Sequence, residues 1–347
     1  MDHGLTTNKD MIIQFEQDAN EAQKTAIINR VKGLKYKPTE VKTQKGDYLI
    51  GTGKKDFDIR SIGSMEGIKD IHIVSDDYKL VSRKWKVKPT EIDLGDGVVI
   101  SEGGFQIMAG PCSIEGEDQI RKTLAHLKAN GIRIMRGGVY KPRSSPYSFR
   151  GMGIDGLKLW YELAKEAGIK IITEVMQVSQ IAEMDPYVDI YQVGARNTQN
   201  FNLLDELGKN TDKPVMIKRG ISGTIDELLY SAEYVFSGGN ERLLLCERGI
   251  RTYEKATRNT MDLNAIPVLK EKSHLPVIAD PSHGIGIRHH VEKIALASIM
   301  AGADGVIYET HEKPEEAYSD GQQTLNFPES DKLINRLQQT FELRESF

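Results

Sequence analysis

Residues 105–347 repeat one pattern eight times: a short apolar run, then a stretch with helical periodicity. The apolar runs are 105–109, 132–135, 170–173, 188–192, 214–217, 242–246, 276–279 and 305–308. The helical stretches are 117–130, 154–167, 178–184, 200–208, 224–236, 262–270, 289–301 and 329–343. Strands that alternate with helices pair in parallel, and eight such units predict a (β/α)₈, or TIM, barrel. A doubly wound open sheet is the alternative, but no G-x-G-x-x-G follows the first run.

A smaller α+β module precedes the barrel. Its expected strands and helices are 11–15, 18–32, 38–44, 47–52, 56–67 and 71–75, in the order β-α-β-β-α-β. Asp18 is the candidate N-cap of the first helix, and Gly33 is its candidate stop. This order is that of a ferredoxin-like split βαβ domain. The module contains no clustered catalytic residue types, so we expect it to bind or regulate; a structural appendage is the alternative.

The pattern divides the chain into three segments. We expect a ferredoxin-like regulatory domain over 11–76, a linker and β-hairpin over 77–104, and a catalytic barrel over 105–347. The hairpin turn lies at Asp96-Gly97, and the hairpin would suit a lid over one end of the barrel. The first ten residues are polar and patternless, which is typical of an added leader or a frayed terminus.

Composition restricts the class of protein. The net charge of −4 argues against nucleic acid as the main partner. The longest apolar runs fall far short of the roughly 20 residues that span a bilayer, and the polar N-terminus lacks a secretory signal. Two cysteines in 347 residues provide no disulfide framework. We therefore expect a cytoplasmic protein without a membrane partner.

Basic residues gather just after the predicted strands, where a TIM barrel places its chemistry. They are Arg136, Lys141, Arg143, Arg196, Lys218 and Arg248. A lone lysine or arginine is usually a surface charge. Six at matching strand ends repel one another unless anions neutralise them, and guanidinium groups suit carboxylate and phosphate. The set predicts a ligand with more than one phosphate or carboxylate group.

A second set of residues follows strands one, seven and eight, which become neighbours when the barrel closes. It consists of Cys112, His283, Glu309 and Asp320. A thiolate, an imidazole and two carboxylates suit a divalent transition metal. Two alternatives stay open at this point: a buried filler cysteine beside a helix-capping histidine, or a nucleophilic Cys112 with His283 as its base. Cys246 lies within a strand and is expected to pack as a small hydrophobe.

Seven motifs carry a resemblance to a known family. They are GPCS (110–113), RGGVYKPRSSPYSF (136–149), GARNTQN (194–200), IKRG (217–220), CERGIRT (246–252), DPSH (280–283) and YSDGQQ (318–323). With them the sequence resembles the 3-deoxy-D-arabino-heptulosonate 7-phosphate (DAHP) synthases, which catalyse the first step of the shikimate pathway. The resemblance covers about 90–340. One branch of that family carries an N-terminal ferredoxin-like domain that mediates feedback inhibition by aromatic amino acids.

The resemblance implies a transferase that condenses phosphoenolpyruvate with erythrose 4-phosphate and releases phosphate. The implied metal ligands are Cys112, His283, Glu309 and Asp320, holding Mn²⁺ or another divalent ion such as Co²⁺, Fe²⁺, Zn²⁺ or Cd²⁺. The implied phosphoenolpyruvate residues are Arg136, Lys141, Arg196, Lys218 and Arg248. The implied erythrose 4-phosphate residues are Lys141, Pro142, Arg143 and Ser144, where serine replaces the commoner threonine and keeps the hydroxyl.

The family also suggests roles and partners. Lys141 lies between both implied substrates and is our candidate proton donor; Cys112 and His283 are the other expected catalytic residues. Tyrosine or phenylalanine is the expected inhibitor, and a homotetramer the expected assembly. The nearest rival is 3-deoxy-D-manno-octulosonate 8-phosphate synthase, which typically reads KANRSS where this chain reads KPRSS. Two further alternatives are a Schiff-base aldolase that uses Lys141 or Lys218, and a non-catalytic sensor.

Overall fold

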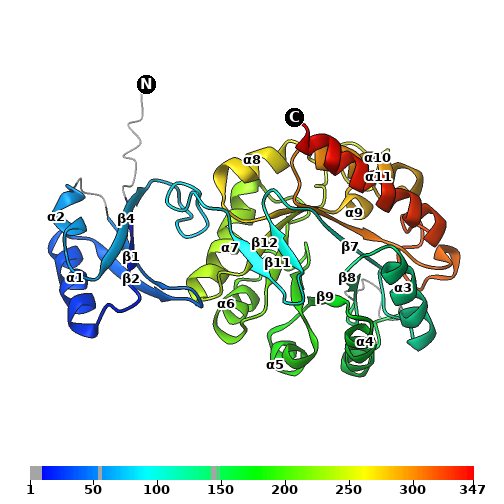
Figure 1. Ribbon diagram of the computed structural model, residues 1–347, viewed down its shortest axis with the longest axis horizontal. Helices are drawn as coiled ribbons and strands as arrows, with labels where there is room; N and C mark the ends of the chain where they lie inside the picture. The colour runs from blue at the N-terminus through cyan, green and yellow to red at the C-terminus, as the bar shows by residue number, and fades with distance from the viewer. Residues whose placement is uncertain (1–9, 54–56, 142–146, 148) are drawn as a thin grey trace.

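The computed structural model describes residues 10–53, 57–141, 147 and 149–347, and the statements below refer to these residues. Figure 1 shows two bodies side by side along the longest axis of the molecule: a small N-terminal module and a larger barrel. Among the described residues, no helix is both long enough and apolar enough to cross a membrane.

Eight parallel strands close into a barrel, in the spatial order β10-β11-β12-β13-β14-β7-β8-β9. Their bounds are β7 Gln106–Gly110, β8 Ile134–Gly137, β9 Lys170–Val175, β10 Ile190–Val193, β11 Val215–Lys218, β12 Leu243–Glu247, β13 Val277–Ala279 and β14 Gly305–Glu309. Strand β7 pairs with both β14 and β8, which completes the closure. The predicted (β/α)₈ barrel is confirmed, with each strand displaced by no more than about two residues.

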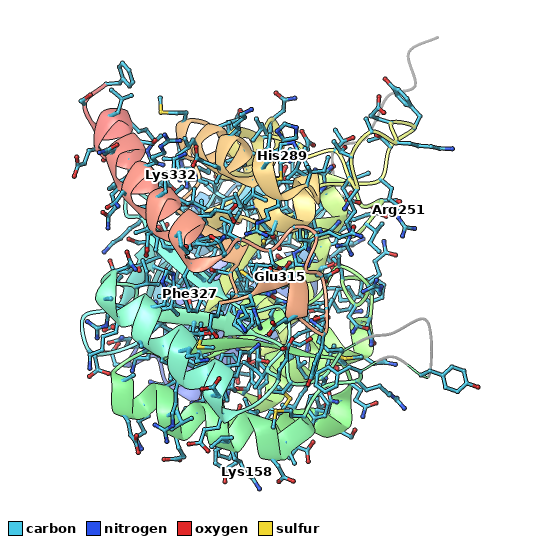
Figure 2. All side chains as sticks on the ribbon, turned by 90° about the vertical axis from the view of Figure 1, so that its right-hand side faces the viewer. Lys158, Arg251, His289, Glu315, Phe327 and Lys332 are labelled. Atoms are coloured by element: carbon cyan, nitrogen blue, oxygen red, sulfur yellow. The ribbon has the colours of Figure 1, made fainter. Side chains whose placement is uncertain are left out.

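Helices surround the barrel strands on the outside. They are α3 Glu117–Ala129, α4 Gly153–Ala167, α5 Ile181–Met184, α6 Phe201–Asn210, α7 Ile225–Gly238, α8 Ala265–Lys272, α10 Arg288–Met300 and α11 Phe327–Glu345. Figure 2 shows α4, α10 and α11, which carry Lys158, His289 and Lys332, on the outer side of the barrel. The short helix α9, Pro281–Ile285, was not predicted; it starts after the N-cap Asp280, directly after β13.

A β-hairpin seals the end of the barrel where the strands begin. Strands β5 (Glu91–Asp93) and β6 (Val99–Ser101) pair antiparallel, and Asp96 and Gly97 at the turn have φ of 54° and 77°. Gly95, just before them, has φ of 78°, and the Leu94 N–H donates to the Val98 carbonyl oxygen, so three residues with positive φ connect the strands. Glycine adopts positive φ freely, and aspartate tolerates it. The hairpin side chains share one buried cluster with inward-facing side chains of the strands. Chemistry is therefore left to the opposite end, where the strands finish.

The N-terminal module is a four-stranded antiparallel sheet in the order β2-β3-β1-β4. Its elements are β1 Asp10–Phe15, α1 Glu21–Gly33, β2 Lys37–Lys42, β3 Asp47–Thr52, α2 Arg60–Gly63 and β4 Ile68–Val74. The predicted element order is confirmed, but α2 is shorter than expected. The predicted N-cap Asp18 is wrong: Asn20 caps α1 through a reciprocal capping box with Gln23, so the helix starts two residues later.

The segment that joins the two bodies packs against the barrel. Leu80, Val81 and Trp85 are buried, and the Trp85 indole N–H donates to the carbonyl oxygen of Leu80 at 3.0 Å. The ring of Tyr48, from β3, makes edge-to-face contacts with Trp85 and with Phe236 of α7. The module and the barrel thus share one apolar contact, with the joining segment between them.

His274 ties this segment to the barrel. Its Nε2–H donates to the carbonyl oxygen of Leu80, and its Nδ1 accepts from the hydroxyl of Thr90, both at 2.8 Å. The side chain is fully buried, and burial lowers the pKa of His274 to about 3. At pH 5 the unfolded chain therefore binds a proton on this imidazole that the folded chain excludes.

We predict that His274 makes the protein less stable as the pH falls below about 6.5. Between pH 7 and pH 5 the loss is about 2 kcal/mol, because the unfolded state alone gains the proton. In the variant His274→Gln, which lacks this titration, the midpoint of thermal unfolding should fall less between the two pH values than in the parent. An equal fall in both proteins would contradict the assignment.

Candidate active site at the open end of the barrel

The open end of the barrel holds a cavity of about 170 Å³ with a strongly cationic wall. The basic residues that line it are Arg136, Lys141, Arg196, Lys218, Arg248, Arg251 and Arg258. Five of the six predicted basic residues are thus brought together. The sixth, Arg143, lies with Pro142 and Ser144 outside the described residues. Arg258 was missed because it comes from the long loop after β12, well past the strand end.

Arg136 is a buried link between this cavity and Glu309. It stands in β8, and its Nη1 donates to the carbonyl oxygen of Pro111 and to Glu309 Oε1, both at 3.0 Å. Its Nε is buried and has no hydrogen-bond partner among the described residues. A buried donor without an acceptor is costly, so this N–H indicates a ligand atom that would accept from it.

Lys218 and Arg248 are also buried at strand ends. Lys218, the last residue of β11, forms an ion pair with Asp280, and both side chains are almost fully enclosed. Burial lowers the pKa of Arg248, whose Nη1 donates to the carbonyl oxygen of Gly249 at 3.1 Å. Two buried cations beside Arg136 make this cavity a site for an anion.

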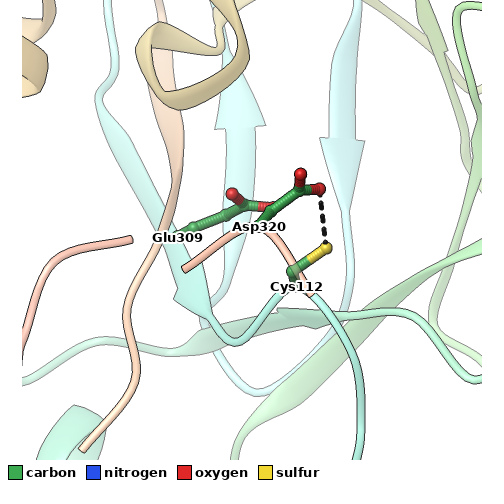
Figure 3. Close-up of side chains that lie close together, drawn as sticks. All are labelled: Cys112, Glu309 and Asp320. Atoms are coloured by element: carbon green, nitrogen blue, oxygen red, sulfur yellow. Dashed lines mark hydrogen bonds between the residues drawn. The ribbon is translucent and has the colours of Figure 1, made fainter. Parts of the chain in front are cut away.

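Cys112, Glu309 and Asp320 form a compact group at the edge of the cavity (Figure 3). One potential ligand atom from each lies within 4.8 Å of those of the other two, and Cys112 Sγ is 3.2 Å from Asp320 Oδ2. His283, from α9, borders the group: its Nε2 is 3.5 Å from Glu309 Oε1. The structure therefore brings together the four residues that the sequence places after three neighbouring strands.

The charges in this group suit a metal cation. Burial alone would raise the pKa of Glu309 and of Asp320, but nearby positive charge outweighs it. His283 lowers both pKa values. Arg136 lowers that of Glu309 further, and Arg258 lowers that of Asp320 further. The pKa of Asp320 falls to about 2, so both carboxylates are ionised at neutral pH. Burial, reinforced by Glu309, raises the pKa of Cys112 to about 11. A cation that displaces this proton would gain a thiolate, and the donor set then suits a divalent transition metal.

The surroundings of Cys112 do not favour a nucleophile. A nucleophilic thiol needs a lowered pKa or a histidine base in hydrogen-bond contact, whereas this thiol has a raised pKa.

Lys141 contacts Cys112 twice. Its Nζ is 3.0 Å from Cys112 Sγ, and it also donates to the Cys112 carbonyl oxygen at 3.0 Å. Lys141 therefore stands between the acidic group and the cavity, within reach of both.

Sequence reasoning missed two residues that support the carboxylates. Gln323 donates from Nε2 to Glu309 Oε2 at 2.7 Å, and it accepts from Arg258 Nη1 at 2.7 Å. The same Arg258 atom donates to Asp320 Oδ1 at 3.1 Å. Gln323 belongs to the YSDGQQ motif, so a signal for it was present, whereas nothing in the spacing of the loop points to Arg258.

Comparison with known proteins finds one family whose model matches most of the chain. The model of the DAHP synthetase I family matches residues 86–346. The chain belongs to this family. A phospho-2-dehydro-3-deoxyheptonate aldolase of Thermotoga maritima is 46% identical over 274 residues, which cover 79% of this chain and 80% of that protein. A 2-dehydro-3-deoxyphosphooctonate aldolase of Syntrophobacter fumaroxidans is 32% identical, over 70% of this chain and 88% of the relative.

Solved structures extend the similarity beyond the barrel. The crystal structure of the Thermotoga maritima DAHP synthase matches with a TM-score of 0.77 and 40% identity, covering 96% of this chain and 98% of that chain. A truncated form of the synthase from the same organism matches with a TM-score of 0.72 and 43% identity, covering 77% of this chain and 97% of its own. The family resemblance expected from the seven motifs is confirmed.

We predict that the protein binds a single Mn²⁺ ion per chain and that Cys112→Ala weakens this binding at least about tenfold, because it removes the soft ligand of the group. Equilibrium dialysis or calorimetry on metal-free protein measures both constants. The matched control is Cys246→Ala, which removes the other buried cysteine from within β12. Equal affinities in the Cys112 variant and the control would place the metal elsewhere.

Proposed function

We propose that the chain condenses phosphoenolpyruvate with erythrose 4-phosphate and water to give DAHP and inorganic phosphate, the first step of the shikimate pathway. The observation that carries the proposal is Arg136. Its guanidinium donates from Nη1 to Glu309 of the acidic group, its buried Nε has no hydrogen-bond partner among the described residues, and the same residue lines the cationic cavity. Anion binding and metal binding therefore meet at one residue, as a reaction between two phosphorylated substrates at a metal requires.

The cationic wall suits the charges of these substrates, which bring two phosphates and a carboxylate. We assign Arg136, Arg196, Lys218 and Arg248 to phosphoenolpyruvate, since they line the cavity together. Lys141 belongs to both substrates because it adjoins the cavity and Cys112. We assign Pro142, Arg143 and Ser144, which follow Lys141 in the KPRSS segment, to the aldose phosphate. Arginine and serine side chains can donate hydrogen bonds to phosphate oxygens.

Each part of the proposed reaction can be assigned to residues of this chain. Cys112, His283, Glu309 and Asp320 would hold a divalent metal, Mn²⁺ in our assignment, which supplies Lewis acidity to the aldehyde oxygen when bound. Carbon 3 of phosphoenolpyruvate attacks the aldehyde carbon while Lys141 donates a proton to the aldehyde oxygen. Water adds at carbon 2, and the hemiketal expels phosphate by cleavage of its C–O bond. The arginines hold the substrate anions and the charge that develops on them.

We also propose a regulatory role for residues 11–76, with 77–104 as linker and hairpin and 105–347 as the catalytic part. The module contacts the barrel through buried polar groups as well as apolar ones. Glu241, almost fully buried just before β12, accepts from the Thr43 hydroxyl at 2.8 Å and from the Lys45 amide at 3.0 Å. Such a contact can transmit the binding of tyrosine or phenylalanine. The proposed setting is a cytoplasmic homotetramer.

The direct test of the function is an assay with two aldoses and controlled metal. We expect the protein to consume phosphoenolpyruvate with erythrose 4-phosphate, to lose at least about 90% of its activity in EDTA, and to recover it with Mn²⁺. Turnover with arabinose 5-phosphate alone would instead identify the octulosonate enzyme. Activity that survives EDTA and is trapped by borohydride as a covalent adduct would identify a Schiff-base aldolase.

The regulatory role predicts that tyrosine or phenylalanine inhibits the full chain and not a chain without the module. The deletion should end at residue 75, because Leu80, Val81 and Trp85 pack on the barrel and belong with it. The truncated protein should keep its phosphoenolpyruvate turnover and lose inhibition by either amino acid. Inhibition that persists after the deletion would place the effector site in the barrel.

A further inference from the structure

One buried carboxylate touches a residue from each of the two functional groups of the site. Asp280 lies between the end of β13 and the start of α9, and it is only 1% exposed. Its Oδ2 accepts from His283 Nδ1 at 2.8 Å and pairs with the amino group of Lys218. Its Oδ1 accepts from the backbone N–H of His283 at 3.1 Å, as the N-cap of α9.

The contact with Asp280 decides which nitrogen of His283 carries the proton. A carboxylate can only accept hydrogen bonds, so the Nδ1 that faces it is protonated. The nitrogen left to bind a metal is then Nε2, the atom that lies 3.5 Å from Glu309 Oε1 at the acidic group. A histidine that binds a metal through one nitrogen generally donates from the other to a carboxylate of this kind.

The contact with Lys218 fixes a residue on the other side of the site. A lysine amino group has three donors on a flexible stem, so its direction depends on its acceptors. Asp280 is a fully enclosed acceptor for Lys218, and Lys218 in turn lines the cavity beside Arg136. Asp280 itself is not among the residues that line this cavity.

We propose that Asp280 is a positioning residue that presents His283 Nε2 to the metal and aims the amino group of Lys218 at the phosphoenolpyruvate cavity. The names of the metal and the substrate rest on the function proposed above. The contrasting role is purely structural, in which Asp280 does no more than cap α9 and fill the space behind it.

The substitution Asp280→Asn separates these two roles. Asparagine is as good an N-cap as aspartate, so Oδ1 can still accept from the His283 backbone. In place of Oδ2, the asparagine presents an NH₂ group to His283 Nδ1 and to the Lys218 amino group. Hydrogen-bond donors then face one another, and neither contact of Asp280 Oδ2 can form. His283 can then bond it only with the proton moved to Nε2, where it blocks the lone pair. Asp262→Asn is the matched control: Asp262 also pairs with a buried cation, Arg219, at 2.8 Å, and it touches neither His283 nor Lys218.

Metal affinity is measured first, on the full-length metal-free variants without substrates, by titration with Mn²⁺. We expect Asp280→Asn to bind Mn²⁺ about 10–100-fold more weakly than the parent, and Asp262→Asn to stay within about twofold. Circular dichroism and thermal unfolding establish that both variants fold. A folded Asp280→Asn protein that binds Mn²⁺ as tightly as the parent would overturn the proposal. Because no turnover is involved, this result stands whether or not the enzyme makes DAHP.

Substrate kinetics test the role toward Lys218. At saturating Mn²⁺, the KM for phosphoenolpyruvate should rise at least about fivefold in Asp280→Asn, because Lys218 loses the acceptor that aims it, while the KM for erythrose 4-phosphate changes less. An unchanged KM for phosphoenolpyruvate would remove Lys218 from the proposal.

A measurement on the unsubstituted protein keeps the proposal testable if the variant does not fold. Long-range ¹H–¹⁵N NMR of protein labelled with ¹⁵N-histidine and loaded with Zn²⁺ reports which ring nitrogen is protonated. We expect His283 to show a protonated Nδ1 and a metal-shifted Nε2, with the signal assigned by its loss in His283→Gln. Protonation at Nε2 would contradict the role of Asp280.

Discussion

The open end of this barrel depends on burying opposite charges together. Arg136 with Glu309, and Lys218 with Asp280, are ion pairs whose four side chains are each about 5% exposed or less. Removing one partner of such a pair leaves an uncompensated buried charge, at a cost of about 3–5 kcal/mol. In each pair the cation lines the cavity. Glu309 belongs to the acidic group, and Asp280 contacts His283, which borders that group. The cationic and acidic halves of the site therefore hold each other in place.

Much of the fold and part of the site follow from local patterns. The alternation of apolar runs and helical stretches predicts a parallel sheet covered by helices, and eight such units without a dinucleotide-binding motif favour the closed barrel over an open sheet. Closure also makes the ends of strands one, seven and eight neighbours, which is why the sequence pattern groups Cys112, His283 and Glu309, as the structure does. Asp320 was grouped with them because it also follows the eighth strand, although it joins them from the loop beyond β14 and not from the strand end.

What the patterns could not predict depends on loop geometry and on competition between similar residues. Asp18 and Asn20 are both acceptable N-caps, and the reciprocal bond with Gln23 decides for Asn20. Arg258 lines the cavity and reaches Asp320 from the loop between β12 and α8, a contact that no periodicity reveals. The module meets its own barrel near Glu241, where the strands begin. Within one chain, the length of the strands separates the proposed effector domain from the cavity.

The central claim is that one metal and one phosphoenolpyruvate share the open end of the barrel across these ion pairs. Anomalous diffraction at the manganese edge, on crystals grown with Mn²⁺ and phosphoenolpyruvate, tests it most directly. The account predicts a single strong peak bonded to Cys112, His283, Glu309 and Asp320, with substrate oxygens on Arg136 and Lys218. A peak away from these four residues, or a substrate bound outside the cationic cavity, would contradict it.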